Sequence, residues 1–195
     1  MTTDEKFMRR ALALACRAEG RTSPNPLVGC VLVKNRRVIA EGWHKACGRD
    51  HAEIDALKKA GPRAKGAVMY VTLEPCAHWG RTPPCVDAVL AAGVRKVVVA
   101  MRDPNPLVNG RSVRKMRARG LEVVTGVGAE EARAVNRAFI KYISRKMPYA
   151  VAKVAQTMDG YAGIRGRQVP WITSAATRAR ARRLRSGFDA ILVGV

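Results

Sequence analysis

The sequence has few acidic residues, few aromatic residues and no long apolar run. Each of these shortages argues against a particular class of protein. Apolar residues make up 48% of its 195 residues. This share supports a globular core and excludes a largely disordered chain. No apolar run approaches the roughly 20 residues that a membrane helix needs. The acidic start lacks the basic and then apolar pattern of a secretion signal, so we expect a soluble, cytoplasmic protein.

Cysteine is also scarce, and its odd count argues against a framework of disulfides. The five cysteines are Cys16, Cys30, Cys47, Cys76 and Cys85. In a chain without a secretion signal, such a set favours free thiols. Cys16 and Cys30 lie in apolar segments and are predicted to be core residues, whereas Cys47 lies in a polar loop. Cys76 and Cys85 remain as the two cysteines that are candidates for an active site.

Positive charge is the strongest bias of the composition. The sequence has 36 Lys and Arg residues against 15 Asp and Glu residues, a net charge of +21. Such an excess suits a nucleic-acid binder. However, the basic residues are spread along the chain without the interleaved aromatic residues of a base-stacking groove. We therefore expect no nucleic acid as the main partner, and an anionic small molecule such as a sugar phosphate explains part of the charge.

Short motifs in the middle of the chain gather one histidine, one carboxylate and two cysteines: His51-Ala52-Glu53, then Pro75-Cys76 and Pro84-Cys85. His51 and two thiolates can hold a zinc ion whose fourth position is open to water, and the metal lowers the pKa of that water towards about 7. Glu53 shares a first helical turn with His51, so it can carry the proton of the water to a ring nitrogen and then to a leaving amine. The pattern predicts hydrolytic deamination of an amidine-like carbon.

The alternative to this site is a chance scatter of buried thiols and a surface carboxylate. Two observations disfavour it. Pro-Cys recurs at a suitable distance after His-Ala-Glu, and all three histidines of the chain, His44, His51 and His78, lie near these motifs. We therefore expect a single active site.

The two cysteines are farther apart than in the usual zinc-deaminase pattern, where two residues separate them. Here eight residues separate Cys76 from Cys85, so this segment must form a loop beside the metal. The loop would bring His78 and Arg81 to the rim of the pocket. A tRNA or nucleoside deaminase is expected to have the shorter spacing. A non-catalytic zinc module, closed by His78 as a fourth ligand, is the other alternative.

Apolar periodicity predicts alternating helices and strands up to about residue 146. Strands are expected at residues 28–33, 38–40, 67–73, 97–100 and 121–124. Helices are expected at about residues 2–20, 51–60, 84–92 and 113–119 and, without a break, at 130–145. This alternation predicts an α/β domain with helices on both faces of a sheet.

The predicted domain boundary is Met147-Pro148, which separates a deaminase domain over residues 1–146 from a second unit over residues 147–195. In the second unit we expect strands at 149–155 and 190–193, and an Arg-rich helix after Ser174. Two strands and one helix in about 48 residues cannot close a stable core alone. This unit is therefore expected to be incomplete or to be completed by another chain, as in a homo-oligomer.

The motifs taken together resemble the bifunctional riboflavin-biosynthesis deaminase/reductase family. The resemblance covers essentially the whole chain and rests on residues 24–29, 51–53, 72–78, 80–85 and 103–106. It implies a cytidine-deaminase-like three-layer α/β/α fold, followed by the incomplete start of a dihydrofolate-reductase-like domain. It further implies zinc-dependent deamination of 2,5-diamino-6-ribosylamino-4(3H)-pyrimidinone 5′-phosphate at the ring carbon that carries the 2-amino group.

The resemblance also implies roles for residues outside the metal motifs. Six residues would bind the substrate, the first five at its base and ribose and the last at its phosphate: Asn25, His44, His78, Asp103, Asn105 and Arg81. Asparagine offers both a donor and an acceptor to a pyrimidine edge, and arginine can form two hydrogen bonds with a phosphate. As alternatives, the asparagines and Asp103 could be turn formers beside prolines, and His44 could be a surface residue.

In the second unit, the resemblance implies the opening segments of an NADPH-dependent reductase. Lys153 and Asp159 would lie near the ribose phosphate of the substrate, and Trp171 and Thr173 near the nicotinamide cofactor. An ordinary core position for Trp171 is the alternative. The later glycine segments that bind the cofactor in this family are absent from the 195 residues. We therefore expect the chain to deaminate but not to reduce.

Overall fold

The computed structural model describes residues 1–79, 83–106, 108–163 and 171–194. The chain forms two units, Met1–Pro148 and Tyr149–Val195. None of the helices in these described ranges combines the length and the apolar character that crossing a membrane requires.

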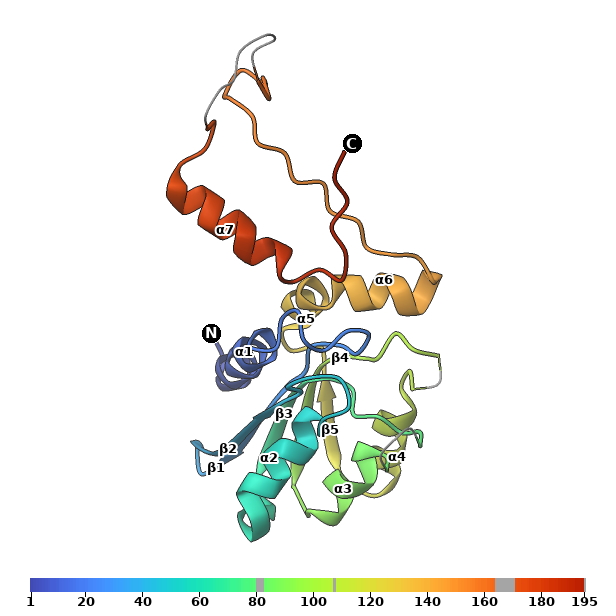
Figure 1. The fold of residues 1–195 in the computed structure, drawn as a ribbon. Coiled ribbons are helices and arrows are strands. Elements are labelled where there is room, and N and C mark those ends of the chain that lie inside the picture. Colours follow the sequence, from blue (N-terminus) through green and yellow to red (C-terminus); the bar gives the residue numbers. More distant parts are fainter. Residues whose placement is uncertain (80–82, 107, 164–170, 195) are drawn as a thin grey trace. The chain divides into compact units, whose positions relative to one another are not determined.

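A five-stranded sheet forms the centre of the first unit, with the strand order β2-β1-β3-β4-β5 (Figure 1). The strands are β1 (Gly29–Lys34), β2 (Arg37–Trp43), β3 (Val68–Leu73), β4 (Lys96–Met101) and β5 (Glu122–Thr125). β1 pairs antiparallel with β2 and with β3, whereas β3, β4 and β5 run parallel. All residues of β3 and all but the first of β4 are buried, as expected for parallel strands covered on both faces.

Helices cover both faces of this sheet. On one face lie α1 (Thr3–Cys16) and α5 (Ala129–Val135), which contact each other. On the other face α2 (Ala52–Ala60), α3 (Cys85–Ala91) and α4 (Arg111–Ala118) form a row, and the 3₁₀ turn η1 (Gly61–Ala64) follows α2. The predicted three-layer α/β/α fold is confirmed.

Two glycines let the helices approach the sheet closely. A Cβ on Gly29 would lie 2.0 Å from the carbonyl oxygen of Ala11 in α1. A Cβ on Gly42 would lie 2.3 Å from the carbonyl oxygen of Ala52 in α2. No side chain fits at either position, because the obstacle is backbone rather than a movable side chain. Since α2 begins beside His51, Gly42 contributes to the placement of the predicted metal motif.

The prediction of one helix over residues 130–145 is wrong, because Asn136 separates α5 from α6 (Arg137–Arg145). The side chain of Asn136 is buried and accepts a hydrogen bond from Leu27 N at 2.8 Å while donating one to Leu27 O at 2.9 Å. Its backbone leaves the helical region, with φ −106° and ψ 17°. A polar side chain that bonds a distant backbone competes with helix continuation, and apolar periodicity does not reveal this.

The core prediction is right for one of two cysteines. Cys30 in β1 is fully buried. Cys16 is exposed, contrary to the prediction, because it lies outside the buried stripe of α1 that includes Ala11, Leu12 and Ala15. Cys47 is exposed, as expected of a polar loop.

The second unit contains, within its described residues, one helix and no paired strand. This helix, α7 (Ala175–Arg185), begins after Ser174, whose hydroxyl accepts a hydrogen bond from Thr177 N, as predicted. The strands predicted at 149–155 and 190–193 are wrong. Both segments are apolar, but a strand also needs a neighbour that completes its hydrogen bonds, and the described residues provide none.

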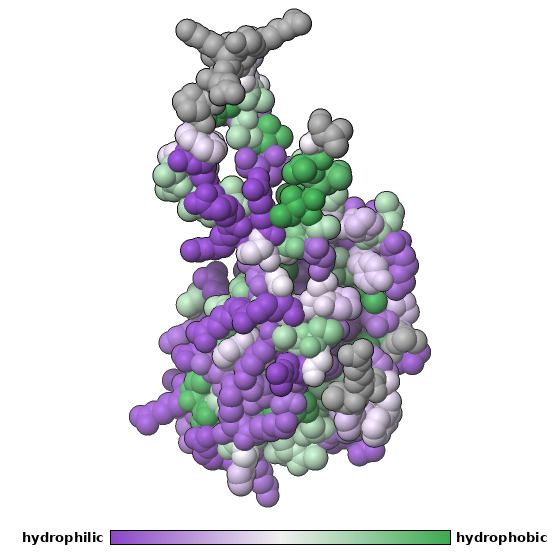
Figure 2. Space-filling view, in the orientation of Figure 1, coloured by the Kyte–Doolittle hydropathy of each residue, from purple (hydrophilic) through white to green (hydrophobic). Residues whose placement is uncertain are grey.

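The second unit also lacks a core among its described residues, since none of them is buried. Leu192, for example, is 99% exposed, and hydrophobic side chains are visible on the surface of this unit (Figure 2). This agrees with the expectation that a segment of about 48 residues cannot bury a stable core by itself.

Candidate metal centre

The three predicted zinc ligands lie where a strand and two helices meet. His51 occupies the residue before α2, Cys76 follows β3, and Cys85 is the first residue of α3. The carboxyl end of a buried parallel strand thus faces the amino ends of two helices. In α/β folds, this edge of the sheet is where ligands usually bind.

The donor atoms of these residues converge. His51 Nδ1 lies 3.1 Å from Cys85 Sγ and 3.6 Å from Cys76 Sγ, and all three atoms lie within 4.8 Å of one another. Zinc–sulfur distances of about 2.3 Å and zinc–nitrogen distances of about 2.0 Å separate two ligands of a tetrahedral ion by about 3.5 Å. The three side chains therefore fit a common zinc ion.

Three protein ligands are typical of a catalytic zinc site, which keeps a position open, whereas structural sites have four. In the part of the chain that the structure describes, His51, Cys76 and Cys85 form the only such group of three or more His, Cys, Asp or Glu donors. His78 is exposed and does not belong to this group. This arrangement favours the catalytic site over the closed zinc module.

The two thiols interact directly with each other. The backbone N–H of Cys85, at the start of α3, donates to Cys76 Sγ at 3.2 Å. The hydrogen bond with the Cys85 thiol lowers the pKa of Cys76 to about 4 against the effect of burial, and His51 lowers it further. The same hydrogen bond, together with burial, raises the pKa of Cys85. A bound metal cation would favour the thiolate form of both.

Glu53 is buried in the first turn of α2, with 3% of its surface exposed. Burial raises the pKa of its carboxyl group to about 7, while the charge of His51 and the hydrogen bond with the Cys85 side chain lower it. A carboxyl group that titrates near neutral pH can both accept and release a proton there. Glu53 therefore has the properties of a proton carrier.

Asn25 and His44 form a pair beside the metal ligands. Asn25 Nδ2 lies 3.1 Å from His44 Nε2, and His44 Nδ1 lies 3.0 Å from Asp50 O. The carbonyl oxygen can only accept, so Nδ1 carries the proton and Nε2 accepts from the amide. Burial lowers the pKa of His44, which favours this neutral form. The ring packs edge to face against His51, with centroids 5.5 Å apart. His44 is thus a buried residue that orients Asn25, rather than a surface residue.

Asp103 and Asn105 follow β4 at the same edge of the sheet. Asn105 N donates to Asp103 Oδ1 at 2.9 Å, so Asp103 does form a turn. Asp103 is nevertheless buried near His78 of the metal loop, the segment between Cys76 and Cys85. Burial raises its pKa to about 6, the hydrogen bond from Asn105 lowers it, the charge of Glu74 raises it, and the charge of His78 lowers it. Turn formation and substrate contact are therefore compatible for this residue.

The remaining predicted residues lie at the surface or outside the described ranges. Arg81 is outside the described residues. Lys153 and Asp159 are exposed, and Trp171 is 69% exposed, so it is not a core residue here. The guanidinium group of Arg178 lies 4.4 Å from the ring centre of Trp171 and donates to Thr173 O at 2.6 Å. This places Trp171 and Thr173 together at the start of α7.

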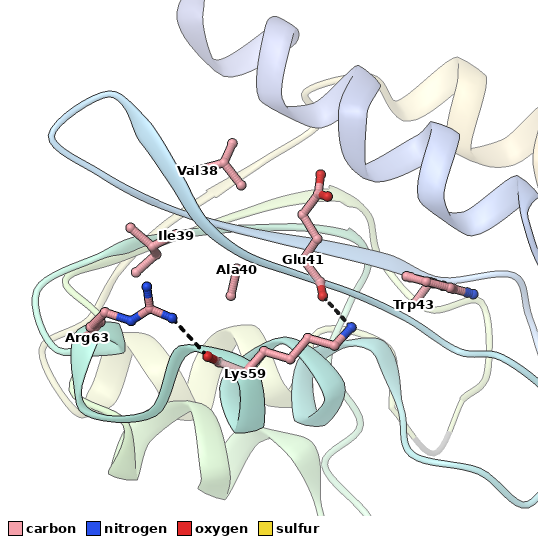
Figure 3. A pocket seen from close by; sticks show the side chains of 7 residues that line it. All are labelled: Val38, Ile39, Ala40, Glu41, Trp43, Lys59 and Arg63. Atoms are coloured by element: carbon pink, nitrogen blue, oxygen red, sulfur yellow. Dashed lines mark hydrogen bonds between the residues drawn. The ribbon is translucent and has the colours of Figure 1, made fainter.

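A shallow pocket of about 440 Å³ lies elsewhere, between the edge strand β2 and the end of α2 (Figure 3). Its lining includes Trp43, Lys59 and Arg63 and none of the predicted site residues. Lys59 donates to Glu41 O at 2.8 Å, and Arg63 donates to Lys59 O at 3.0 Å (Figure 3). These basic groups already bind backbone carbonyls, and Lys59 protects the edge of the sheet.

Sequence reasoning overlooked one buried carboxylate beside the metal ligands, Glu74. It lies between β3 and Cys76, is 3% exposed, and accepts four hydrogen bonds from the segment 103–113. A charged residue that directly follows a buried strand and precedes a metal ligand is the only local signal that marks it.

Comparisons with known proteins identify the family of this chain. The model of the cytidine and deoxycytidylate deaminase zinc-binding region matches residues 1–101, and that of the RibD C-terminal domain matches residues 148–195. The riboflavin biosynthesis protein RibD of Aquifex aeolicus is 49% identical over 192 residues, which cover 98% of this chain and 54% of that protein.

Two solved structures are similar in fold and sequence. RibD of Acinetobacter baumannii, form 1, has a TM-score of 0.87 and 46% identity, covering 94% of this chain and 52% of that chain. A diaminohydroxyphosphoribosylaminopyrimidine deaminase/5-amino-6-(5-phosphoribosylamino)uracil reductase of Thermotoga maritima has a TM-score of 0.88 and 42% identity, covering 94% and 53%. The chain spans about half the length of these relatives. Its zinc-binding region and its identity to them show that it belongs to the RibD family of riboflavin biosynthesis proteins.

Proposed function

We propose that this chain catalyses the zinc-dependent hydrolytic deamination of 2,5-diamino-6-ribosylamino-4(3H)-pyrimidinone 5′-phosphate. One observation carries the proposal: His51 Nδ1 and the sulfurs of Cys76 and Cys85 converge within 4.8 Å, and the buried Glu53 is in the first turn of the same helix that follows His51. The name of the Thermotoga maritima relative, which includes a diaminohydroxyphosphoribosylaminopyrimidine deaminase, supports this substrate.

The protein contributes metal ligands and a proton carrier. When held by these ligands, zinc supplies the Lewis acid that activates water for attack on the ring carbon bearing the 2-amino group. Glu53 accepts one proton from the water and delivers it to the neighbouring ring nitrogen, and then transfers the remaining proton of the added hydroxyl group to the leaving amine. A carbon–oxygen bond replaces a carbon–nitrogen bond, and ammonia leaves.

The substrate contacts in this proposal come from three segments around the metal ligands. The amide of Asn25, oriented by His44, would bind the pyrimidine edge. Asp103 and Asn105 would bind the base and ribose from the loop after β4. His78 would approach from the metal loop, and Arg81 of the same loop would bind the phosphate.

The decisive experiment measures ammonia release from the diaminopyrimidine phosphate by the zinc-loaded protein. We expect Glu53→Gln to lower kcat by about 10³-fold, because the proton carrier is lost. The zinc content should remain that of the wild type, because Glu53 is not one of the three ligands. Glu19→Gln, which changes an exposed carboxylate, serves as the matched control and should retain full activity.

Two results would contradict the proposal. If zinc-loaded wild-type protein releases no ammonia from this substrate, the alternative of a non-catalytic zinc-binding module is favoured. Release of ammonia from cytidine, adenosine or tRNA instead would indicate the nucleoside or tRNA deaminase alternative.

The reductase step is not part of this proposal. None of the described residues from 149 to 194 is buried, so they form no enclosed site for a dinucleotide. The involvement of Lys153, Asp159, Trp171 and Thr173 in NADPH-dependent reduction stays a prediction. Oxidation of NADPH in the presence of the deaminated product would show that the 195 residues suffice.

For this reaction we propose a small pyrimidine ribosyl phosphate as the partner rather than nucleic acid. We also propose a cytoplasmic location and the association of copies into a homo-oligomer. The absence of buried side chains among the described residues of the second unit supports association, because its apolar residues need a cover. Analytical ultracentrifugation tests this, and a monomer at micromolar concentration would contradict it.

A further inference from the structure

The buried carboxylate of Glu74, between β3 and Cys76, binds the segment after β4. Its Oε2 atom accepts hydrogen bonds from Gly110 N at 2.8 Å and from Asp103 N at 3.4 Å. Its Oε1 atom accepts from Ser112 Oγ at 2.7 Å and from Val113 N at 3.2 Å. One carboxylate therefore satisfies four donors on a segment that is distant in sequence.

Helix α4 depends on this carboxylate for its cap. The residue before the helix is Gly110, with φ 74°, which has no side chain to accept a hydrogen bond from the first turn. The first N–H groups of a helix have no partner within it, and a negative charge near them is favourable. Glu74, from the end of the neighbouring strand, accepts from Gly110 and Val113 and so replaces the missing capping side chain.

The same carboxylate holds both ends of the segment from Asp103 to Gly110. The N–H groups of these two residues bind the same oxygen atom, and the turn between Asp103 and Asn105 lies just inside the first end. Glu74 is two residues from the metal ligand Cys76. The backbone hydrogen bond from Glu74 N to Met101 O, at 3.0 Å, and the Glu74 side chain together fix Asp103 and Asn105 relative to the metal ligands.

We propose that Glu74 is a positioning residue that determines how tightly the site binds its pyrimidine substrate. This inference rests on the proposed function, because it assigns substrate contacts to Asp103 and Asn105. Charge and geometry both matter at this position. A glutamine would offer one accepting oxygen, and its NH₂ group would face N–H or O–H donors. At least one of the four donors would therefore lose its acceptor.

The test compares Glu74→Gln with Asp87→Asn. Asp87 of α3 forms an exposed ion pair with Lys115 of α4, so this control perturbs the same helix without removing a hydrogen bond from its first turn. We expect Glu74→Gln to raise KM about tenfold, because hydrogen bonds to a charged group are lost, while the zinc content is unchanged and kcat changes less than KM. Amide hydrogen exchange at Gly110 and Val113 should accelerate about tenfold. Asp87→Asn should change neither KM nor the amide exchange at Gly110 and Val113.

A double-mutant cycle links the effect to the loop. If Glu74 acts through Asn105, then Glu74→Gln should raise KM much less in an Asn105→Ala background than in the wild type. Should Glu74→Gln fail to fold, Ser112→Ala removes only one of the four donors, and we expect it to raise KM about threefold with faster exchange at Val113.

A lower melting temperature with unchanged KM, in either variant, would overturn the inference and leave Glu74 with a purely structural role. Equal effects on KM in the two backgrounds of the cycle would overturn it as well. Failure of the proposed function is recognised separately, because wild-type protein would then release no ammonia. In that case unchanged exchange at Gly110 and Val113 in Glu74→Gln would still refute the positioning role.

Discussion

The two units of the chain use apolar residues differently. In Met1–Pro148 the apolar strands lie between two layers of helices, and β3 is buried along its whole length. In Tyr149–Val195 none of the described residues is buried, and Leu192 is 99% exposed. The comparison shows that an apolar pattern becomes a strand or a core only where a second layer covers it.

The two units also differ in how they hold polar groups. In the first unit the carboxyl groups of Glu53, Glu74 and Asp103 are buried next to the metal ligands, each within a frame of backbone donors or charged partners. In the second unit Asp159 is exposed and accepts a hydrogen bond from Thr157, two residues away. Preorganised chemistry requires such a frame, because an unpartnered buried charge is strongly unfavourable.

The largest expected effect comes from the close approach of α2 to the sheet. Gly42→Ala would place a Cβ 2.3 Å from Ala52 O and 2.4 Å from Ala56 N, so α2 must shift. We expect the free energy of unfolding to fall by about 3 kcal/mol in urea denaturation. Gly163→Ala in the second unit, where a Cβ meets nothing within 4 Å, should change it by less than about 0.5 kcal/mol. Equal losses of the free energy of unfolding in the two variants would contradict this difference in packing between the units.

A smaller effect comes from Asp55, which connects α2 to β2. Its carboxylate accepts from Lys59 Nζ at 2.8 Å and from Trp43 N at 3.3 Å. Burial raises its pKa, but Lys59 and its other donors outweigh burial, so the pKa in the folded protein is lowered. The carboxylate therefore stabilises the fold above the unfolded pKa of about 3.9, and this contribution is lost as the pH falls towards the folded value.

The free energy of unfolding of Asp55→Asn should accordingly lie roughly 1 kcal/mol below that of the wild type at pH 7. This difference should shrink below about pH 4. Urea denaturation at several pH values measures it, with the exposed Asp87→Asn as a control that shows little difference at any pH. A difference between wild type and Asp55→Asn that grows as the pH falls would contradict this account.

The smallest effect on global stability is expected from the cap of α7. Ser174→Ala removes the hydroxyl that accepts from Thr177 N and should weaken this helix by about 1 kcal/mol. Because the described residues of the second unit bury nothing, the urea midpoint should stay unchanged while amide exchange in the first turn of α7 accelerates. Thr2→Ala removes the equivalent cap from α1, which packs on the sheet, and should shift the midpoint. A shift of the midpoint by Ser174→Ala would show that the units unfold together.

Periodicity predicts the first unit well because its strands and helices each have a buried face. The strand predicted at 97–100 corresponds to β4, and the helix predicted at 51–60 corresponds to α2. The break at Asn136 could not be predicted, because its cause is the backbone of Leu27, 109 residues away. The strands predicted in the second unit failed for the opposite reason, because the local apolar pattern is present but the described residues of this unit form no β-ladder.

The candidate site likewise has some features that the sequence predicts and others that it does not. The spacing of His51, Cys76 and Cys85 indicates a metal centre, because few other functions need these residue types together. The role of Glu74 could not be read from its neighbours, since its donors come from residues 103 to 113. Likewise, the orientation of Asn25 by His44 depends on the carbonyl group of Asp50, which no motif marks.

The sequence by itself determined the fold class and the residues that can bind zinc, because these follow from local periodicity and from the chemistry of a few side chains, and its motifs carried the resemblance to the family. Only the tertiary structure decided which donor pairs with which acceptor: Asn136 with Leu27, His44 with Asp50, and Glu74 with the cap of α4. The physical reason is that a buried polar group must find a partner in space, and the chain brings that partner near only after the sheet and its helices have assembled.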